Sequence, residues 1–185
     1  MESYTIFPQE KIYLRDLAKK QLEYASRPVM REREALWYRH NDMQDSRPMV
    51  FIETDTFWND IMPELKCSTA LGREIESHIL KEIASAELID DDKVIPDFYE
   101  VEIHLEHQKF GVEQKKTYAD DGLGYHIEPV LEILENDFEK LSPTRFGFDE
   151  PDFILKCNCI REVIGDVLPI KIVNGTNKVY LTNLF

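Results

Sequence analysis

The pattern of apolar and polar positions is most informative at residues 47–55, where a heavily charged stretch gives way to a short apolar run. The run is rich in residues that favour β-structure, and two acids, Glu53 and Asp55, follow it. This pattern predicts a buried strand over residues 49–53, whose C-terminal end presents carboxylates to a cleft.

Further apolar runs predict the other strands. Residues 93–97 give a second buried strand that again ends in an acid, and residues 168–173 give a third, followed by a turn signal. Residues 99–105 alternate between apolar and polar side chains, as in a half-exposed strand or an extended loop. Two short extended pieces, at 110–112 and 122–127, complete an irregular β excursion.

Helices separate these strands. Apolar residues at helical spacing predict helices over residues 9–25, 29–44, 69–88, 133–141 and 150–166. Ser68 or Thr69 is the expected cap of the third helix. Because strands and helices alternate along the chain, their order favours a parallel sheet with right-handed crossovers. We expect a helical arm over residues 1–46 and a β/α region over residues 47–185.

Composition restricts the classes of function. The chain has 185 residues, enough for one ordinary domain, and a net charge of −14, which argues against binding to nucleic acid. No apolar run approaches a membrane span of about 20 residues, and the first residues lack the basic region of a secretory signal. The three cysteines lack paired spacing, so we expect reduced thiols in a cytoplasmic protein, with Cys157 as a core thiol.

The acids that follow the predicted strands are candidate catalytic groups, although a solvated loop end is the simpler interpretation of each. His104 and His107 lie three residues apart on an extended segment. Their side chains then point to opposite sides and cannot easily hold one ion. His126 has no visible partner, so the sequence predicts no metal site.

Several short segments carry a resemblance to a known family. They are Arg15–Leu22, Arg47–Glu53 with Trp58, Val94–Asp97, Phe110–Glu113, Tyr125–Pro129 and Asp137–Leu141. In these segments the chain resembles the uroporphyrinogen decarboxylase superfamily. It is most similar to the decarboxylase-like branch that lies near the corrinoid methyltransferases.

The resemblance implies a (β/α)₈ barrel of the TIM type, which needs about 250 residues. This chain is then expected to be the N-terminal portion of an incomplete barrel, as a fragment or a truncated member. The implied activity is corrinoid-linked methyl transfer or decarboxylation, by a methyltransferase or a carboxy-lyase, with Asp97 as the catalytic residue. The implied substrate-binding residues are Glu53, Trp58, Tyr99, His104 and His126.

The resemblance places no cofactor in this chain, because the zinc ligands of the methyltransferases belong to the C-terminal half of a complete relative. Corrinoid or zinc is expected only in such a relative, with a corrinoid protein as partner. Porphyrinogen decarboxylation itself is disfavoured, because the arginine-rich motif that grips porphyrin carboxylates does not follow the first strand. The alternative is a non-catalytic α/β protein that self-associates, or pairs with a second polypeptide, through an open sheet edge and the apolar residues 179–185.

Overall fold

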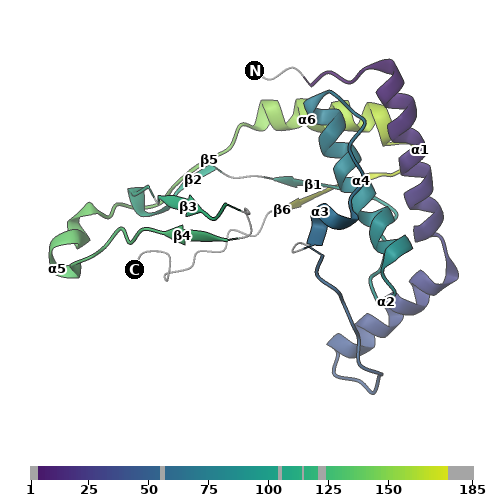
Figure 1. The fold of residues 1–185 in the computed structure, drawn as a ribbon, viewed down its shortest axis with the longest axis horizontal. Coiled ribbons are helices and arrows are strands. Elements are labelled where there is room, and N and C mark those ends of the chain that lie inside the picture. The colour runs from purple at the N-terminus through teal and green to yellow at the C-terminus, as the bar shows by residue number, and fades with distance from the viewer. Residues whose placement is uncertain (1–3, 55–56, 104–105, 114, 121–123, 175–185) are drawn as a thin grey trace. The chain divides into compact units, whose positions relative to one another are not determined.

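The computed structural model describes residues 4–54, 57–103, 106–113, 115–120 and 124–174. The chain divides into two compact units. The first comprises Met1–Val101 and Pro151–Ile172, and the second comprises Glu102–Glu150 and Val173–Phe185. Helices make up most of the first unit, whereas short strands and turns make up most of the second (Figure 1).

The helices of the first unit follow the predicted pattern closely. They are α1 (Pro8–Ala25), α2 (Pro28–Asn41), α3 (Trp58–Ile61), α4 (Ala70–Leu88) and α6 (Glu150–Ile164). Proline begins α1 and α2, where its fixed φ suits the first turn and its missing N–H is not needed. The hydroxyl oxygen of Thr69 accepts a hydrogen bond from the Gly72 amide at 3.2 Å, which confirms Thr69 as the cap of α4.

The hydrophobic core of this unit joins α1, α4, α6 and the first strand. Leu14, Ile75 and Ile160, one from each helix, are fully buried in it. Helices α1 and α4 pack directly against each other, so the residues predicted as an arm belong to the same compact unit as the core. Cys157 is buried in this cluster, which confirms the predicted core thiol, and burial raises the pKa of that thiol.

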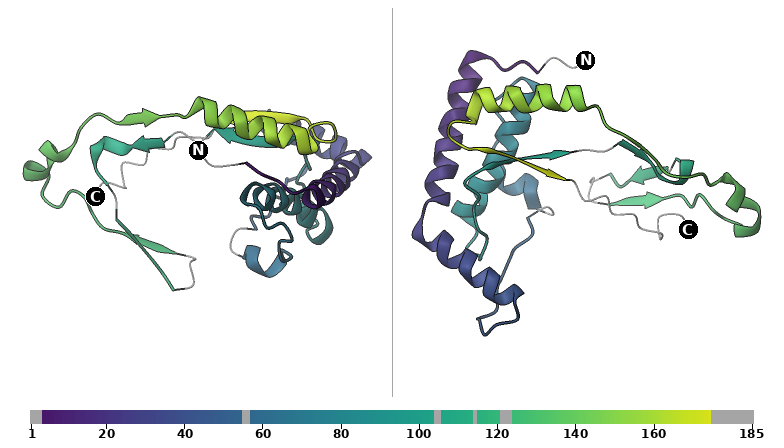
Figure 2. Two further views of the ribbon diagram at one scale, coloured as in Figure 1. Left: turned by 90° about the horizontal axis from the view of Figure 1, so that it is seen from above. Right: turned by 180° about the vertical axis from the view of Figure 1, so that it is seen from behind.

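Two strands, β1 (Tyr99–Ile103) and β6 (Ile170–Asn174), form a two-stranded sheet. The Tyr99 amide donates to the Pro169 carbonyl at 2.9 Å, so the two strands start at the same end and run parallel (Figure 2). For residues 99–105, the strand alternative is confirmed over Tyr99–Ile103, and residues 104–105 lie outside the described part of the chain. The strand predicted over 168–173 is confirmed from Ile170 onward. Alternate residues of β1 face the core, as the sequence pattern indicates, because Tyr99 is buried and Glu100 is exposed.

The other two predicted strands are wrong. Residues 49–53 belong to no strand in the described part of the chain, and Val50, Phe51 and Ile52 are 53%, 58% and 40% exposed. Residues 93–97 are irregular, and among them only Ile95 is buried. A short apolar run does not specify a strand by itself, because strand formation also requires a neighbouring backbone in register.

The second unit is built from two antiparallel strand pairs and short turns. Strand β2 (Glu106–Gln108) pairs with β5 (Arg145–Gly147), and β3 (Lys116–Tyr118) pairs with β4 (Tyr125–Ile127). The unit also has three short helical turns, which are η2 (Lys109–Gly111), α5 (Leu134–Asp137) and η3 (Phe138–Lys140). The extended piece predicted over 122–127 is confirmed over Tyr125–Ile127, and residues 122 and 123 lie outside the described part of the chain. The short helix predicted near residues 133–141 is also confirmed. The extended piece at 110–112 is wrong, because Phe110 has φ 53° inside a 3₁₀ turn.

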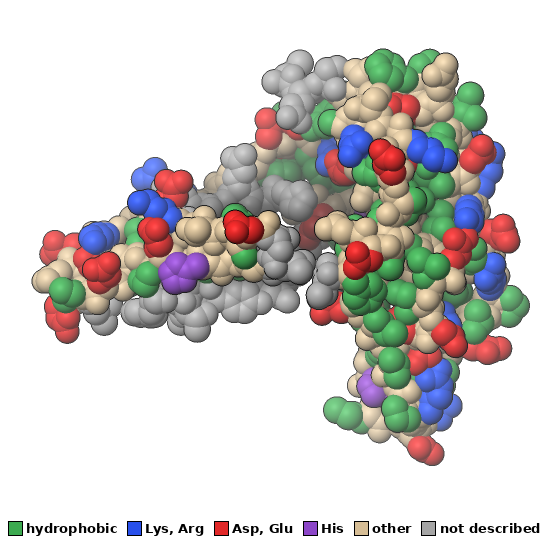
Figure 3. Space-filling model, in the orientation of Figure 1, with side chains coloured by type: hydrophobic (Ala, Val, Ile, Leu, Met, Phe, Trp, Pro, Cys, Tyr) green, Lys and Arg blue, Asp and Glu red, His purple; other side chains and the backbone are tan. Residues whose placement is uncertain are grey.

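The fold is therefore mixed α/β. Three two-stranded sheets are present in the described part of the chain, and they do not form a closed barrel. None of the described helices is both long and apolar enough to cross a membrane. Acidic and basic side chains are interspersed over the visible face of the helical unit (Figure 3).

Candidate functional site

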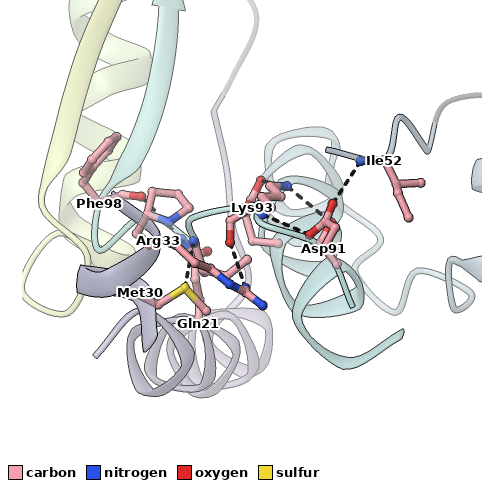
Figure 4. A network of polar contacts seen from close by, with 11 residues as sticks. Gln21, Met30, Arg33, Ile52, Asp91, Lys93 and Phe98 are labelled. Atoms are coloured by element: carbon pink, nitrogen blue, oxygen red, sulfur yellow. Dashed lines mark hydrogen bonds and ion pairs between the residues drawn. The ribbon is translucent and has the colours of Figure 1, made fainter. Parts of the chain in front are cut away.

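The irregular segment before β1 is fixed by side chains that bind its backbone (Figure 4). Gln21 of α1 is fully buried, and its Nε2 donates to the carbonyls of Pro96 at 2.9 Å and Phe98 at 3.4 Å. The Oε1 atom of this glutamine is buried without a hydrogen-bond partner among the described residues. Gln21 therefore positions the Phe98 backbone from beneath.

Helix α2 holds the beginning of the same segment. Arg33 donates to the carbonyl of Lys93 at 3.0 Å, and the indole Nε1 of Trp37 donates to the carbonyl of Asp92 at 2.7 Å. Because the carbonyls of Asp92 and Lys93, like those of Pro96 and Phe98, accept hydrogen bonds from side chains, an irregular backbone is stable here without strand pairing. The contacts also fix the position of the Trp37 ring.

Two aspartates that follow α4 bind the segment 47–54, in which the apolar side chains of residues 50–52 are exposed. Asp92 accepts hydrogen bonds from both terminal nitrogens of Arg47 and from the Val50 amide, and its own amide donates to the Val50 carbonyl at 2.8 Å. Asp91 accepts from the Ile52 amide at 3.0 Å. The hydrogen bond from Arg47 holds the pKa of Asp92 well below its usual value. Side chains thus replace the strand ladder predicted for this segment.

A cleft of about 610 Å³ opens between α2 and the start of β1. Its aromatic lining is Trp37, Tyr38 and Phe98, and its lining carboxylates are Glu34, Glu82 and Glu100. The volume lies within the range of small-molecule sites, roughly 300–1,000 Å³. Cleft residues come from α2, α4, β1 and β6, so this is where distant parts of the sequence meet.

Two lysines also line the cleft, and both already have partners. The Nζ atom of Lys93 lies 3.0 Å from both carboxylate oxygens of Glu82. Both side chains of this ion pair are mostly buried, at 17% and 12% exposure. The ammonium of Lys171 lies over the ring of Phe98, 4.4 Å from its centroid. Neither lysine is then available as a free cation for an anionic ligand.

A second polar centre surrounds the start of α4, and it is built on the buried carboxylate of Glu76. Its Oε1 accepts from the Tyr13 hydroxyl at 2.9 Å and from the Lys66 amide at 2.8 Å, and its Oε2 accepts from the Cys67 amide at 2.8 Å. Burial and the nearby Glu76 charge raise the pKa of Cys67 to about 12. Glu76 thus fixes the loop before α4, and the Cys67 thiol stays protonated.

Glu10 of α1 binds the next residues of the same loop. Its carboxylate accepts from the Ser68 amide at 2.6 Å, the Thr69 hydroxyl at 2.7 Å and the Phe7 amide at 3.2 Å. Burial alone would raise its pKa, but these hydrogen bonds outweigh burial and lower the pKa to about 2. The carboxylate oxygens of Glu10 and Glu76 all accept hydrogen bonds, mainly from the loop before α4 and from the start of α1. We therefore interpret both carboxylates as structural.

The predicted catalytic residue, Asp97, lies just before β1 and not after a strand, and its side chain is exposed. In parallel β/α folds the ligand site forms beyond the carboxyl ends of the strands, so Asp97 lies at the opposite end of β1. Tyr99 is 2% exposed, and its ring packs against His78 with centroids 4.5 Å apart. A substrate therefore has no open surface on Tyr99 in this structure.

The other predicted binding residues are dispersed. Glu53 is exposed in the segment 47–54, and Trp58 begins α3, where the Lys81 ammonium lies 5.3 Å from its ring centroid. His126 is exposed on β4 in the second unit, and His104 lies outside the described residues. No hydrogen bond or ion pair joins any two of the predicted site residues in the described part of the chain.

The residues that line the cleft were not selected by sequence reasoning. Glu100 had a signal, because the alternation in β1 indicates that its side chain faces away from the core. Trp37, Phe98 and Lys171 had none, since they lie far apart along the chain and meet only in the fold. In the described part of the chain, no group of three or more His, Cys, Asp or Glu side chains has the arrangement of a metal site.

Searches of protein-family models, curated proteins and solved structures found no match to this chain. The site is therefore defined by its own geometry. That geometry comprises an aromatic and acidic cleft, an apolar run with exposed side chains at residues 50–52, and a parallel strand pair.

Proposed function

We propose that this chain is an assembly module that self-associates by adding strands to the β1–β6 pair. The observation that carries the proposal is that β1 and β6 pair only with each other among the described residues. Parallel sheets occur almost only with more strands and with both faces covered, because each open edge leaves backbone donors and acceptors unpaired. A second copy of the chain is the proposed occupant, and another polypeptide is the alternative.

Exposed apolar side chains support this assembly. Val50, Phe51 and Ile52 are consecutive, and each is at least 40% exposed. Ile172, in β6, is 49% exposed. Runs of exposed apolar residues on a protein surface mark interaction sites more often than single residues do.

Light scattering coupled to size-exclusion chromatography tests the assembly over a range of protein concentrations. We expect the mass to rise with concentration, and Ile172→Lys to shift the equilibrium toward monomer because it places a charge beside the sheet edge. Ile12→Lys is the matched control, since Ile12 is 65% exposed on α1. A monodisperse monomer at every concentration, with both variants unchanged, contradicts the proposal.

The parallel strand pair favours a second candidate function, which is catalysis of the uroporphyrinogen decarboxylase type. A parallel β-α-β unit is the repeating element of a (β/α)₈ barrel, and here α6 leads into β6 after β1. In this proposal the chain contributes the first strands of a larger barrel. The chemistry of that barrel would be corrinoid-linked methyl transfer or decarboxylation. Asp97, the catalytic residue that the resemblance implies, has an exposed carboxylate, but it precedes β1, so this proposal requires a site at the N-terminal end of that strand.

The test is made on the purified assembly. One reaction contains zinc, a methylated corrinoid as the methyl donor and a thiol as the acceptor, and a second contains a carboxylic acid as the substrate for decarboxylation. We expect thiol methylation or release of carbon dioxide, reduced by Asp97→Asn and unchanged by Asp90→Asn. An assembly that shows neither reaction and binds neither group rejects the catalytic proposal and leaves the assembly proposal intact.

A further inference from the structure

The cleft between α2 and β1 has the composition of a site for a positively charged organic ligand. Three aromatic side chains, Trp37, Tyr38 and Phe98, line it together with carboxylates. Aromatic rings carry negative charge on their faces, so they attract cations, and quaternary ammonium groups are commonly held in aromatic cages. We propose that this cleft binds a small alkylated ammonium compound, and this proposal does not depend on the assembly above.

The structure already contains one such contact. The Lys171 ammonium lies 4.4 Å from the centroid of the Phe98 ring, well within the range of about 6 Å for a cation–π contact. Lys171 is exposed and covers this ring face, so a ligand ammonium would have to take the place of the Lys171 ammonium on Phe98. The Phe98 face is therefore suited to an ammonium group.

The charges of the cleft also favour a cation. Lys93 is neutralised by its ion pair with Glu82. Glu34 and Glu100 are exposed on the cleft wall and have no ion-pair partner in the described part of the chain. The net charge of −14 on the whole chain adds a long-range attraction for cations. An anionic ligand would meet these two carboxylates, and the ion pair with Glu82 already occupies Lys93.

The aromatic walls are held in place before a ligand binds. The Trp37 indole is anchored by its 2.7 Å hydrogen bond to the Asp92 carbonyl. The backbone of Phe98 is anchored from below by the buried Gln21. Tyr38 is 66% exposed at the rim and can close over a ligand by rotation of its side chain. Because the Trp37 ring and the Phe98 backbone are held before a ligand arrives, the site loses less conformational entropy on binding.

An NMR titration of the full chain tests the proposal with choline as the probe. The neutral comparison is 3,3-dimethylbutan-1-ol, in which a carbon atom replaces the quaternary nitrogen at nearly the same shape. The chain has two tryptophans, so the indole signal of Trp37 reports on the cleft and that of Trp58 serves as an internal control. We expect millimolar choline to shift the Trp37 signal alone, and the neutral alcohol to leave it unchanged.

Two variants separate the cation–π contact from the charge. Tyr38→Ala is expected to weaken choline binding by about three- to five-fold, the size of an exposed cation–π contact, and Glu100→Gln is expected to weaken it as well. The matched controls are Tyr118→Ala and Glu23→Gln, whose parent side chains are exposed and lie outside the cleft lining. The proposal is overturned by equal shifts with choline and the alcohol, by no shift with choline, or by equal effects of cleft and control variants.

Discussion

Replacing Glu76 tests whether a buried carboxylate without a cation stabilises the first unit. Its two oxygens accept three hydrogen bonds, from Tyr13, Lys66 and Cys67. In Glu76→Gln, the amide nitrogen takes the place of one oxygen. If it replaces Oε2, it faces the Cys67 amide, and two donors then confront each other. A buried donor without an acceptor costs about 1–3 kcal/mol, so we expect a loss of about 2 kcal/mol in the free energy of unfolding.

Glu76→Ala removes both acceptor atoms and leaves the Lys66 and Cys67 amides unsatisfied, while the half-buried Tyr13 hydroxyl can turn toward water. Two orphaned amides cost about 2–6 kcal/mol, so we expect a loss near 4 kcal/mol, a large part of a typical stability of about 5–15 kcal/mol.

Urea unfolding followed by circular dichroism measures both losses. Glu74→Gln is the control on the same helix, because Glu74 is 49% exposed in its ion pair with Lys156. An exposed pair contributes less than about 1 kcal/mol. If Glu76→Gln costs no more than Glu74→Gln, the carboxylate does not hold the loop before α4, and the reasoning is refuted.

Three further outcomes are expected. The pKa of Glu10 is lowered from 4.5 to about 2, so its stabilising effect is fully present above pH 4.5 and is lost as the pH falls toward 2. Glu10→Gln should flatten the curve of unfolding free energy against pH between pH 4.5 and 2. An unchanged curve would show that Glu10 does not stabilise the fold as a carboxylate. Asp92→Asn should speed hydrogen exchange at the Val50 amide, which it binds at 2.9 Å, whereas exposed Asp90→Asn should not; equal rates in both variants would count against the tether. Because the other two thiols are buried, a thiol reagent should label Cys159 fast in the folded chain, and more than one fast thiol would show that the core is open.

The helices were predictable because their signals are local. In α1, Leu14 and Ala18 occupy one face at helical spacing, and both are fully buried. Proline and the Thr69 cap mark helix starts through the geometry of a few adjacent residues. The alternation in β1 worked for the same reason, since successive residues of a strand face opposite sides whatever its partner is.

The segment 49–53 shows that local sequence patterns do not predict contacts between distant parts of the chain. Its composition suits a strand, yet its backbone bonds to Asp91 and Asp92, about forty residues further along the chain. The burial of Glu76 could not be predicted from the sequence either. A charged residue in a helix is expected to be exposed, and Glu76 is buried because Tyr13 and the loop before α4 contact it in the folded chain. Hydrogen-bond partners that are distant in sequence produce no periodic pattern of residues, either in the segment 49–53 or in the helix that carries Glu76.

Sequence patterns alone thus located the helices, the Thr69 cap of α4, the inward face of β1 and the core position of Cys157. Tertiary structure decided which apolar runs became strands, which carboxylates were buried, and that Trp37, Phe98 and Lys171 line one cleft. The physical reason is that propensity and side-chain period act within a few residues, whereas backbone pairing, burial and cleft formation depend on which distant segments come into contact.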